Sequence, residues 1–182
     1  MKSNIIALAI SSLFIMGTAC AEDTPATLSV TANVTQKMTA CQVNLDKSSL
    51  ELTGEANKLI AQGEKATSIT PFVMTVIGVD NNFTCGKKLL DGEIAVRFVG
   101  TYDNADGNTL ANKATGETAA SGIGIGLFNT KNEPIDITQP YKLPSVTNAP
   151  TVYLGMQLVK LNGQEPKEGA VSSDMTIQIE RL

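Results

Sequence analysis

Cysteine is the residue type in this sequence best suited to do chemistry, and it occurs at Cys20, Cys41 and Cys85. Cys20 ends an N-terminal export signal described below, so processing would leave one pair. An even pair of cysteines outside the cytosol indicates a disulfide. A bond between Cys41 and Cys85 would close a loop of about 44 residues and stabilise the fold by about 4 kcal/mol in the chain-entropy model. We predict a structural disulfide.

Histidine is absent from the chain. This excludes Ser-His-Asp and Cys-His catalytic arrangements and the commonest metal ligand. Two pairs of closely spaced glutamates could act as acid and base in glycoside hydrolysis. They are Glu51 with Glu55, and Glu165 with Glu168. Both lie in polar stretches where a carboxylate is normally solvated, so we expect no catalytic residue, no cofactor, no metal ligand and no enzymatic activity.

Two other motifs resemble ligand-binding loops. Gly122, Gly124 and Gly126 alternate with bulky apolar residues, but a nucleotide-binding loop needs a helix directly after it, and none is predicted. Glycines on one face of a strand instead indicate the close approach of another backbone. Residues 103–108 (DNADGN) have the composition of a calcium loop, yet Ala105 stands at a ligand position and no glutamate follows at the twelfth. We interpret this run as a solvated turn.

The N-terminus has the pattern of a secretory signal peptide. Lys2 precedes the apolar run 5–16, and the small residues Ala19-Cys20-Ala21 follow it. The run is too short to span a bilayer, so we predict a signal peptide over residues 1–21, cleaved after Ala21. Lipidation of Cys20 is the alternative. Cleavage would take the formal net charge from -4 to -5 because Lys2 is lost, and such mild acidity argues against a nucleic-acid or anionic-membrane partner.

The run from Thr27 to Val34 (TLSVTANV) follows the signal and alternates apolar and polar residues. Successive side chains of a strand point to opposite faces, so one face carries the apolar residues. These are Leu28, Val30, Ala32 and Val34. A tail with this pattern must pair with a sheet, either in its own molecule or in a neighbour.

The rest of the chain contains several short strand patterns joined by polar turns, which predicts an all-β sandwich in a single domain. The strands are expected in 42–52 (two pieces around a turn at 46–49), 69–79, 93–100, 121–129, 133–137, 151–159 and 171–179. Residues 54–66 are expected to form a loop or a single helical turn, and 102–116 a surface loop. A turn is predicted at 80–82 with Phe83-Thr84-Cys85 following it, and no amphipathic helix is predicted anywhere.

Taken together, these features resemble the subunits of chaperone-usher fimbriae, the type 1 or F17-like major pilin family. The resemblance covers the whole chain. It rests on the signal peptide, the alternating tail, Thr39-Ala40-Cys41, the dense strand beginning Ile69-Thr70-Pro71-Phe72, the segment TAASGIGIGLFN (118–129) followed by a turn and Pro134-Ile135, and the terminal strand within 169–179.

The resemblance implies an incomplete immunoglobulin-like sandwich whose open groove is completed by a donor strand. It implies a donor extension at 22–35, with Leu28, Val30, Ala32 and Val34 entering the groove of a neighbouring subunit, and a pilin domain at 36–182. The terminal strand lining that acceptor groove would contribute Val171, Ser173, Met175, Ile177 and Ile179. Strand addition of this kind combines main-chain hydrogen bonds with side chains that fill pockets.

The resemblance also implies partners and a location. A periplasmic chaperone would fill the groove first, the tail of the next subunit would replace it, and an outer-membrane usher would export the growing adhesive fimbria to the cell surface. A minor adaptor or a ligand-binding, tip-proximal subunit is the alternative to a structural subunit.

Overall fold

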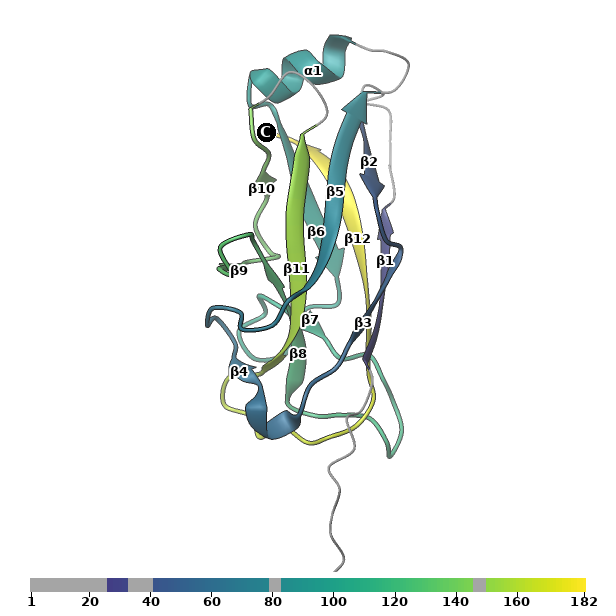
Figure 1. Cartoon of the computed structure of the whole chain (residues 1–182), viewed down its shortest axis with the longest axis vertical. Coiled ribbons are helices and arrows are strands. Elements are labelled where there is room, and N and C mark those ends of the chain that lie inside the picture. Colours follow the sequence, from purple (N-terminus) through teal and green to yellow (C-terminus); the bar gives the residue numbers. More distant parts are fainter. Residues whose placement is uncertain (1–25, 33–40, 79–82, 146–149) are drawn as a thin grey trace, which may run out of the picture.

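The computed structural model describes residues 26–32, 41–78, 83–145 and 150–182, which form two sheets packed face to face (Figure 1). The first sheet contains, in spatial order, β10 (Tyr141–Lys142), β6 (Ile94–Gly100), β12 (Val171–Arg181), β1 (Ala26–Ala32) and β3 (Ser49–Leu52). The second contains β2 (Cys41–Leu45), β5 (Thr70–Gly78), β11 (Thr151–Lys160), β8 (Ile123–Phe128) and β7 (Leu110–Ala111), with β4 (Ile60–Ala61) beside β11 and β9 (Pro134–Ile135) beside β8. The predicted all-β sandwich is confirmed.

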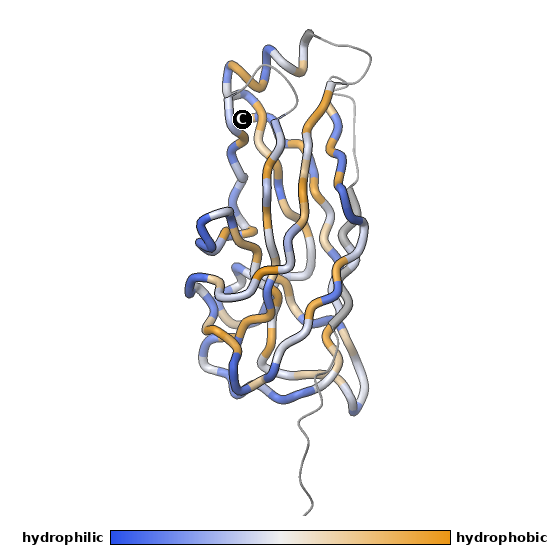
Figure 2. Tube along the Cα trace, viewed as in Figure 1, coloured by the Kyte–Doolittle hydropathy of each residue, from blue (hydrophilic) through white to orange (hydrophobic). Residues whose placement is uncertain are grey.

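The core lies between the sheets and follows from strand alternation. In β5, Phe72, Met74 and Val76 are buried, while the residues between them are half-buried. In β6, Ile94, Val96 and Phe98 face the same core, as predicted. Figure 2 shows the same alternation, with apolar and polar stretches following one another along the strands. Burying each large side chain contributes about 1.5 to 3 kcal/mol, so this layer supplies most of the driving force for folding.

The two strand pieces predicted in 42–52 form β2 and β3, which belong to opposite sheets. The chain crosses between the sheets just after Asp46, whose side chain accepts a 2.7 Å hydrogen bond from the amide of Val73 while its own amide donates to the Val73 carbonyl. This exchange closes the end of β2 against β5. The pairing of β2 with β5 ends at Leu45 and Met74, so Pro71 has no partner in β2. Its missing N–H therefore costs no hydrogen bond between these two strands.

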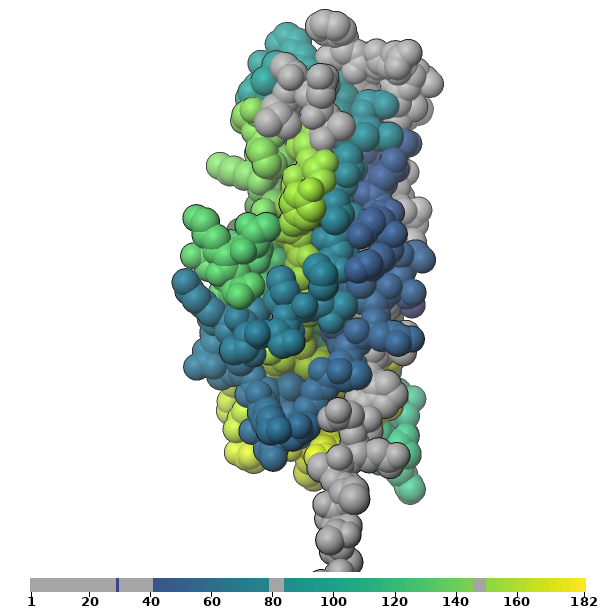
Figure 3. Space-filling view, in the orientation of Figure 1, coloured from purple at the N-terminus to yellow at the C-terminus, as the bar shows by residue number. Residues whose placement is uncertain are grey.

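The segment 59–69 covers the outer face of β8 and β11 in the lower half of the molecule (Figure 3). Its amides at Thr67 and Ser68 both donate to the side-chain oxygen of Gln157. A second small core of Ala66, Phe128 and Val159 lies beneath it. This cover explains why every residue of β8 is buried, on both faces of the strand.

The structure contradicts the prediction that no amphipathic helix is present. α1 (Phe83–Leu90) begins where an irregular continuation was expected, and the turn predicted at 80–82 lies outside the described residues. Cys85 and Leu89, four residues apart, are its buried face. The helix ends at Gly92 in a left-handed conformation (φ 70°), with the Gly92 and Glu93 amides bonding back to the carbonyls of Leu89 and Lys88. Two turns were too short to show a helical period in the sequence.

Candidate functional site

The terminal strand β12 forms one wall of the candidate site. It lies between β6 and β1 in the first sheet, and its ladder with β6 runs from Met175 opposite Gly100 to Arg181 opposite Ile94. Its core-facing residues are Val171, Ser173, Met175 and Ile177, all buried, and Ile179, which is half-buried. The structure therefore places all five residues predicted for this strand on a single row.

The short strand β3 forms the opposite wall. Leu50 and Leu52 point into the core and are 3% and 2% exposed, whereas Ser49 and Glu51 point to solvent. β3 has no hydrogen-bonded strand on its other side among the described residues, so it is an edge strand of the first sheet. Between β12 and β3 the sheet has room for one further strand, and that groove is the candidate site.

β1 occupies this groove and is paired along both edges. It runs parallel to β12, from Ala26 opposite Val171 to Ala32 opposite Ile177, and antiparallel to β3, from Ala26 opposite Leu52 to Ser29 opposite Ser49. Ser29 is exposed, as its place on the polar face of the alternating run requires. The tail thus completes the sheet of its own molecule here. The sequence-based expectation of a groove left open for a neighbour differs from this arrangement.

The physical reason is the cost of the unpaired edge. Without β1, the facing backbone groups of β12 and β3 would lack partners, and each buried unpaired group costs about 1 to 3 kcal/mol. In a single chain, the nearest strand-patterned segment that can satisfy them is its own tail. Leu28, Val30 and Ala32 take part in this pairing, whereas Val34, the fourth predicted donor residue, lies outside the described residues.

Ser173 is the polar exception on the core-facing row of β12. It is 6% exposed, and its Oγ is buried without a hydrogen-bond partner. Elsewhere in the described chain, buried polar groups are satisfied, as Gln62 is by Asp103, Asn108 and Asn162. In the register of the groove, Ser173 lies opposite Leu28, a residue whose side chain offers no hydrogen bond.

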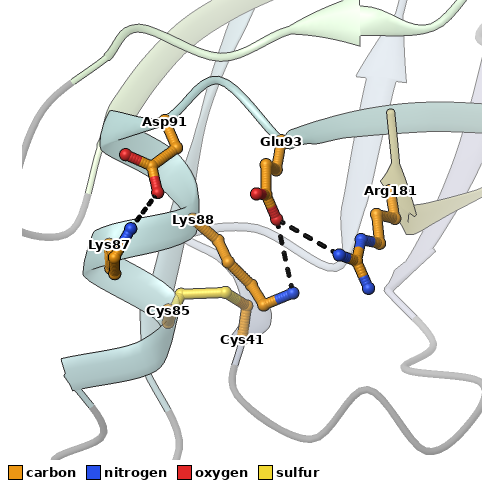
Figure 4. Close-up of polar contacts among 7 residues, drawn as sticks. All are labelled: Cys41, Cys85, Lys87, Lys88, Asp91, Glu93 and Arg181. Atoms are coloured by element: carbon orange, nitrogen blue, oxygen red, sulfur yellow. Dashed lines mark hydrogen bonds and ion pairs between the residues drawn. A yellow bond between two sulfur atoms is a disulfide. The ribbon is translucent and has the colours of Figure 1, made fainter.

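The α1 end of the groove is fastened by covalent and ionic contacts (Figure 4). A disulfide joins Cys41 at the start of β2 to Cys85 on α1, which is the pair expected from the sequence. The Glu93 carboxylate lies 3.6 Å from Lys88 Nζ and 3.5 Å from the Arg181 guanidinium at the end of β12. The helix, the first strand of the domain and the terminal strand therefore meet at one end of the sandwich.

The predicted solvated turn at 103–108 is wrong for its first residue. Asp103 is buried, and its carboxylate accepts hydrogen bonds from the amides of Ala105, Gly107 and Thr109, from the Thr109 hydroxyl and from Gln62, at 2.8 to 3.1 Å. Burial raises the pKa of Asp103, but the backbone amides and Gln62 outweigh it and hold the pKa below its usual value. The carboxylate organises the loop from within, a role that composition could not reveal.

The remaining motifs have structural roles. Gly124 and Gly126 lie in β8, where a Cβ at Gly124 would come within 3.1 Å of the Leu110 carbonyl, so close backbone approach is confirmed there. Glu165 and Glu168 are exposed. Glu55 pairs with Lys58 at 2.7 Å. No group of three potential metal ligands occurs among the described residues. In the same residues, no helix is both long and apolar enough to cross a membrane.

Comparison with known proteins gives one match by sequence family. A family described as fimbrial protein matches residues 27–180, a span that begins at the second residue of β1 and ends within β12. A search of curated proteins found no match.

Two solved structures match this chain at low sequence identity. An antigen and type I fimbria protein of Burkholderia pseudomallei is 20% identical, with a TM-score of 0.42, over 87% of this chain and 95% of that one. The CupB6 tip adhesin of Pseudomonas aeruginosa is 12% identical, with a TM-score of 0.40, over 71% of this chain and 48% of the adhesin.

Proposed function

This chain belongs to the fimbrial protein family, and from that premise we propose that it is a structural subunit of an adhesive fimbria, polymerised when the tail of one copy completes the groove of the next. The observation that carries the proposal is the pairing of β1 with both β12 and β3. A strand contributed by the tail fills the groove that the rest of the sandwich leaves between β12 and β3.

The groove can bind a strand from its own molecule or from another one. Its recognition consists of backbone hydrogen bonds on two edges and a row of buried side chains, and neither is specific to a covalently attached tail. β1 joins the domain only through 33–40, which lies outside the described residues. Release of the tail from one groove and insertion into another replaces one strand paired on both edges by another, so a polymer can form while both edges of the groove stay paired.

The topology supports one direction for such an exchange. Cys41, where the domain begins after the tail, lies at the α1 end, because it is bonded to Cys85 of α1. β12 also ends there, since the Leu182 amide donates to the Glu93 carbonyl. A released tail would leave the molecule at this end. In a head-to-tail fibre, it would enter the next copy from the opposite end, with its N-terminus leading, and would therefore run antiparallel to β12.

The two orientations thus distinguish the monomer from the fibre. Parallel pairing with β12 arises when the chain folds back on itself, and antiparallel pairing when a neighbour supplies the strand.

We assign the parts of the chain accordingly: residues 1–21 as signal peptide, 22–35 as donor extension and 36–182 as the groove-bearing domain. The partners are further copies of this chain, a periplasmic chaperone and an outer-membrane usher, and the protein reaches the cell surface through the periplasm. We propose no enzymatic role.

Deletion of residues 24–34 tests the proposal. The truncated chain should be recovered with a chaperone that covers the groove and should fail to extend fibres, while the intact chain polymerises. The matched control replaces Thr27, Ser29 and Thr31 on the polar face by alanine, which keeps the apolar row and should still polymerise. Fibres of normal length from the truncated chain, seen by electron microscopy, would overturn the proposal.

A further inference from the structure

Resting on the proposed function, we infer that Ser173 sets the register of the neighbour's strand, by taking that copy's Ala32 opposite it in the assembled fibre. The starting observation is that Ser173 Oγ is buried and unpaired while the chain's own tail fills the groove. A buried hydroxyl without a partner is costly, and its retention in a functional groove needs an explanation.

The own-chain register explains why the hydroxyl lacks a partner. Leu28 lies opposite Ser173 on β12 and opposite Leu50 on β3, so the row through Ser173 is otherwise apolar. Leu50 is 3% exposed. Nothing in this row can donate to or accept from the hydroxyl, and a leucine is among the larger side chains that could stand there.

Reversal of the strand changes the neighbour of Ser173. An antiparallel donor that covers the same length of β12 places its inward-phase residues in the opposite order along the buried row. We take the segment 28–34, which carries all four apolar residues of the tail, as the one that spans Val171 to Ile177. Val34 then stands opposite Val171, Ala32 opposite Ser173, Val30 opposite Met175 and Leu28 opposite Ile177. All four apolar residues of the tail then lie opposite a core-facing residue of β12.

This register places the smallest of the four apolar tail residues, Ala32, opposite the smallest core-facing residue of β12, Ser173. Ala32 carries a single methyl group and is smaller than leucine, so a row of Ala32 and Ser173 offers more space beside the hydroxyl than a row of leucine and serine. Space lined by a hydroxyl and by backbone groups can hold a water molecule that bridges them, which is how buried polar groups are commonly satisfied. A shift by two residues would place Val30 or Val34 over the hydroxyl and remove that space.

Cysteine pairs can read the register directly. Copies of the full chain carrying Ser173→Cys are assembled into fibres with copies carrying one tail substitution, Val30→Cys, Ala32→Cys or Val34→Cys. Each chain carries one new cysteine, so a new disulfide can form only between copies, and covalent dimers are counted on non-reducing gels. The expected result is that Ala32→Cys gives the dominant dimer.

The alternative outcomes separate the inference from the function on which it rests. Dominant dimers with Val30→Cys or Val34→Cys would overturn the role of Ser173 while leaving strand exchange intact. Fibres that form without a dimer from any of the three tail positions would count against strand exchange itself, and the inference would fall with it.

A second measurement separates a register role from simple packing. The groove chain carries Ser173→Ala together with Met175→Cys, and the tail chain carries one cysteine. In the proposed register Met175→Cys forms its dimer with Val30→Cys, whereas a strand shifted by two residues brings Leu28→Cys or Ala32→Cys opposite it. We expect the shifted fraction to rise, because alanine no longer disfavours a bulky residue opposite it. Ser49→Ala is the control, since Ser49 is an exposed serine on the other wall. An unchanged distribution in Ser173→Ala would contradict the inference, and a preserved denaturation midpoint would show that the variant folds.

Discussion

Cys41 and Cys85 are 44 residues apart in sequence and 5.2 Å apart between their Cα atoms, and their disulfide fastens α1 to the first strand of the second sheet. Both residues are buried, at 3% and 1% exposure. Together with Leu89, which is buried in the same core, the bond holds α1 against the sandwich.

Replacement of both cysteines by serine should therefore destabilise the domain. Loss of the constraint on the unfolded chain lowers the free energy of unfolding by about 4 kcal/mol, with a further loss from two hydroxyls buried in place of sulfur. Denaturant unfolding of the purified double variant measures the change, and its yield in the periplasm should fall. Equal midpoints for the variant and the oxidised parent would show that the bond is dispensable.

Val30→Asp should release β1 from the groove. Val30 lies opposite Met175, which is fully buried, so the substitution would bring a charge into the core row. We expect the free energy of unfolding to fall by about 1.5 to 3 kcal/mol, with the docking free energy of β1 as the upper limit, because the strand can detach. Faster proteolysis of the tail is the measurement.

Thr31→Asp is the matched control for that experiment. Thr31 lies opposite Thr176, which is only half-buried, and it occupies the polar phase of the strand. We expect tail proteolysis close to that of the parent. If the two variants were cleaved equally fast, the assignment of inward and outward faces in β1 would be wrong.

Asp103 should make stability depend on pH in the acid range. The pKa of Asp103 in the folded state lies below the usual value of an aspartate, so its contribution to stability is fully present above the unfolded-state pKa and is lost as the pH falls through the folded-state pKa. Asp103→Asn should lower the free energy of unfolding at neutral pH by about 1 to 3 kcal/mol and flatten this acid dependence. Asp136→Asn is the control, since that exposed aspartate organises a turn at the surface. An unaltered acid profile in Asp103→Asn would contradict the prediction.

Gly122→Ala should be far more harmful than Gly92→Ala. Both glycines have positive φ, 67° and 70°, so each alanine meets a similar backbone penalty of about 1 kcal/mol. At Gly122, a Cβ would also stand 2.5 Å from the Glu165 carbonyl oxygen, whereas at Gly92 nothing lies within 4 Å. Thermal unfolding of the two variants isolates the steric cost. Equal losses would show that the 165–168 loop moves aside freely.

Much of the fold could be read from local patterns. The alternation in 93–100 and 171–179 predicted strands whose buried faces the structure confirms, because alternating side chains fall on opposite faces of a strand. The dense apolar run 69–79 predicted a strand buried on both faces; the structure confirms the strand, but one of its faces is only half-buried. The pairing of Cys41 with Cys85 followed from their number and compartment. The helix α1 could not be read in this way, because two turns carry too few residues to show a period, although Gly92 after Lys87 and Lys88 was an available signal of a helix end.

Other features depended on residues distant in the chain. Asp103 looked like a solvated turn residue, and only the approach of Gln62, 41 residues away, together with the folded loop, made it a buried centre of hydrogen bonds. The unpaired hydroxyl of Ser173 is likewise invisible in a sequence, where serine in a strand has no defined neighbour. The hydroxyl lacks a partner because β12, β1 and β3 place Ser173 beside Leu28 and Leu50.

The sequence by itself determined that the tail forms a strand and that β12 is a strand of the same alternating type with which it can pair. Period-two alternation and the need to pair backbone groups are local properties of the chain. Only the tertiary structure decided which molecule supplies the strand and in which direction. A single chain satisfies both edges by folding its own tail back parallel to β12, because Ala26–Ala32 and Val171–Arg181, far apart in the sequence, become neighbours only in the folded domain.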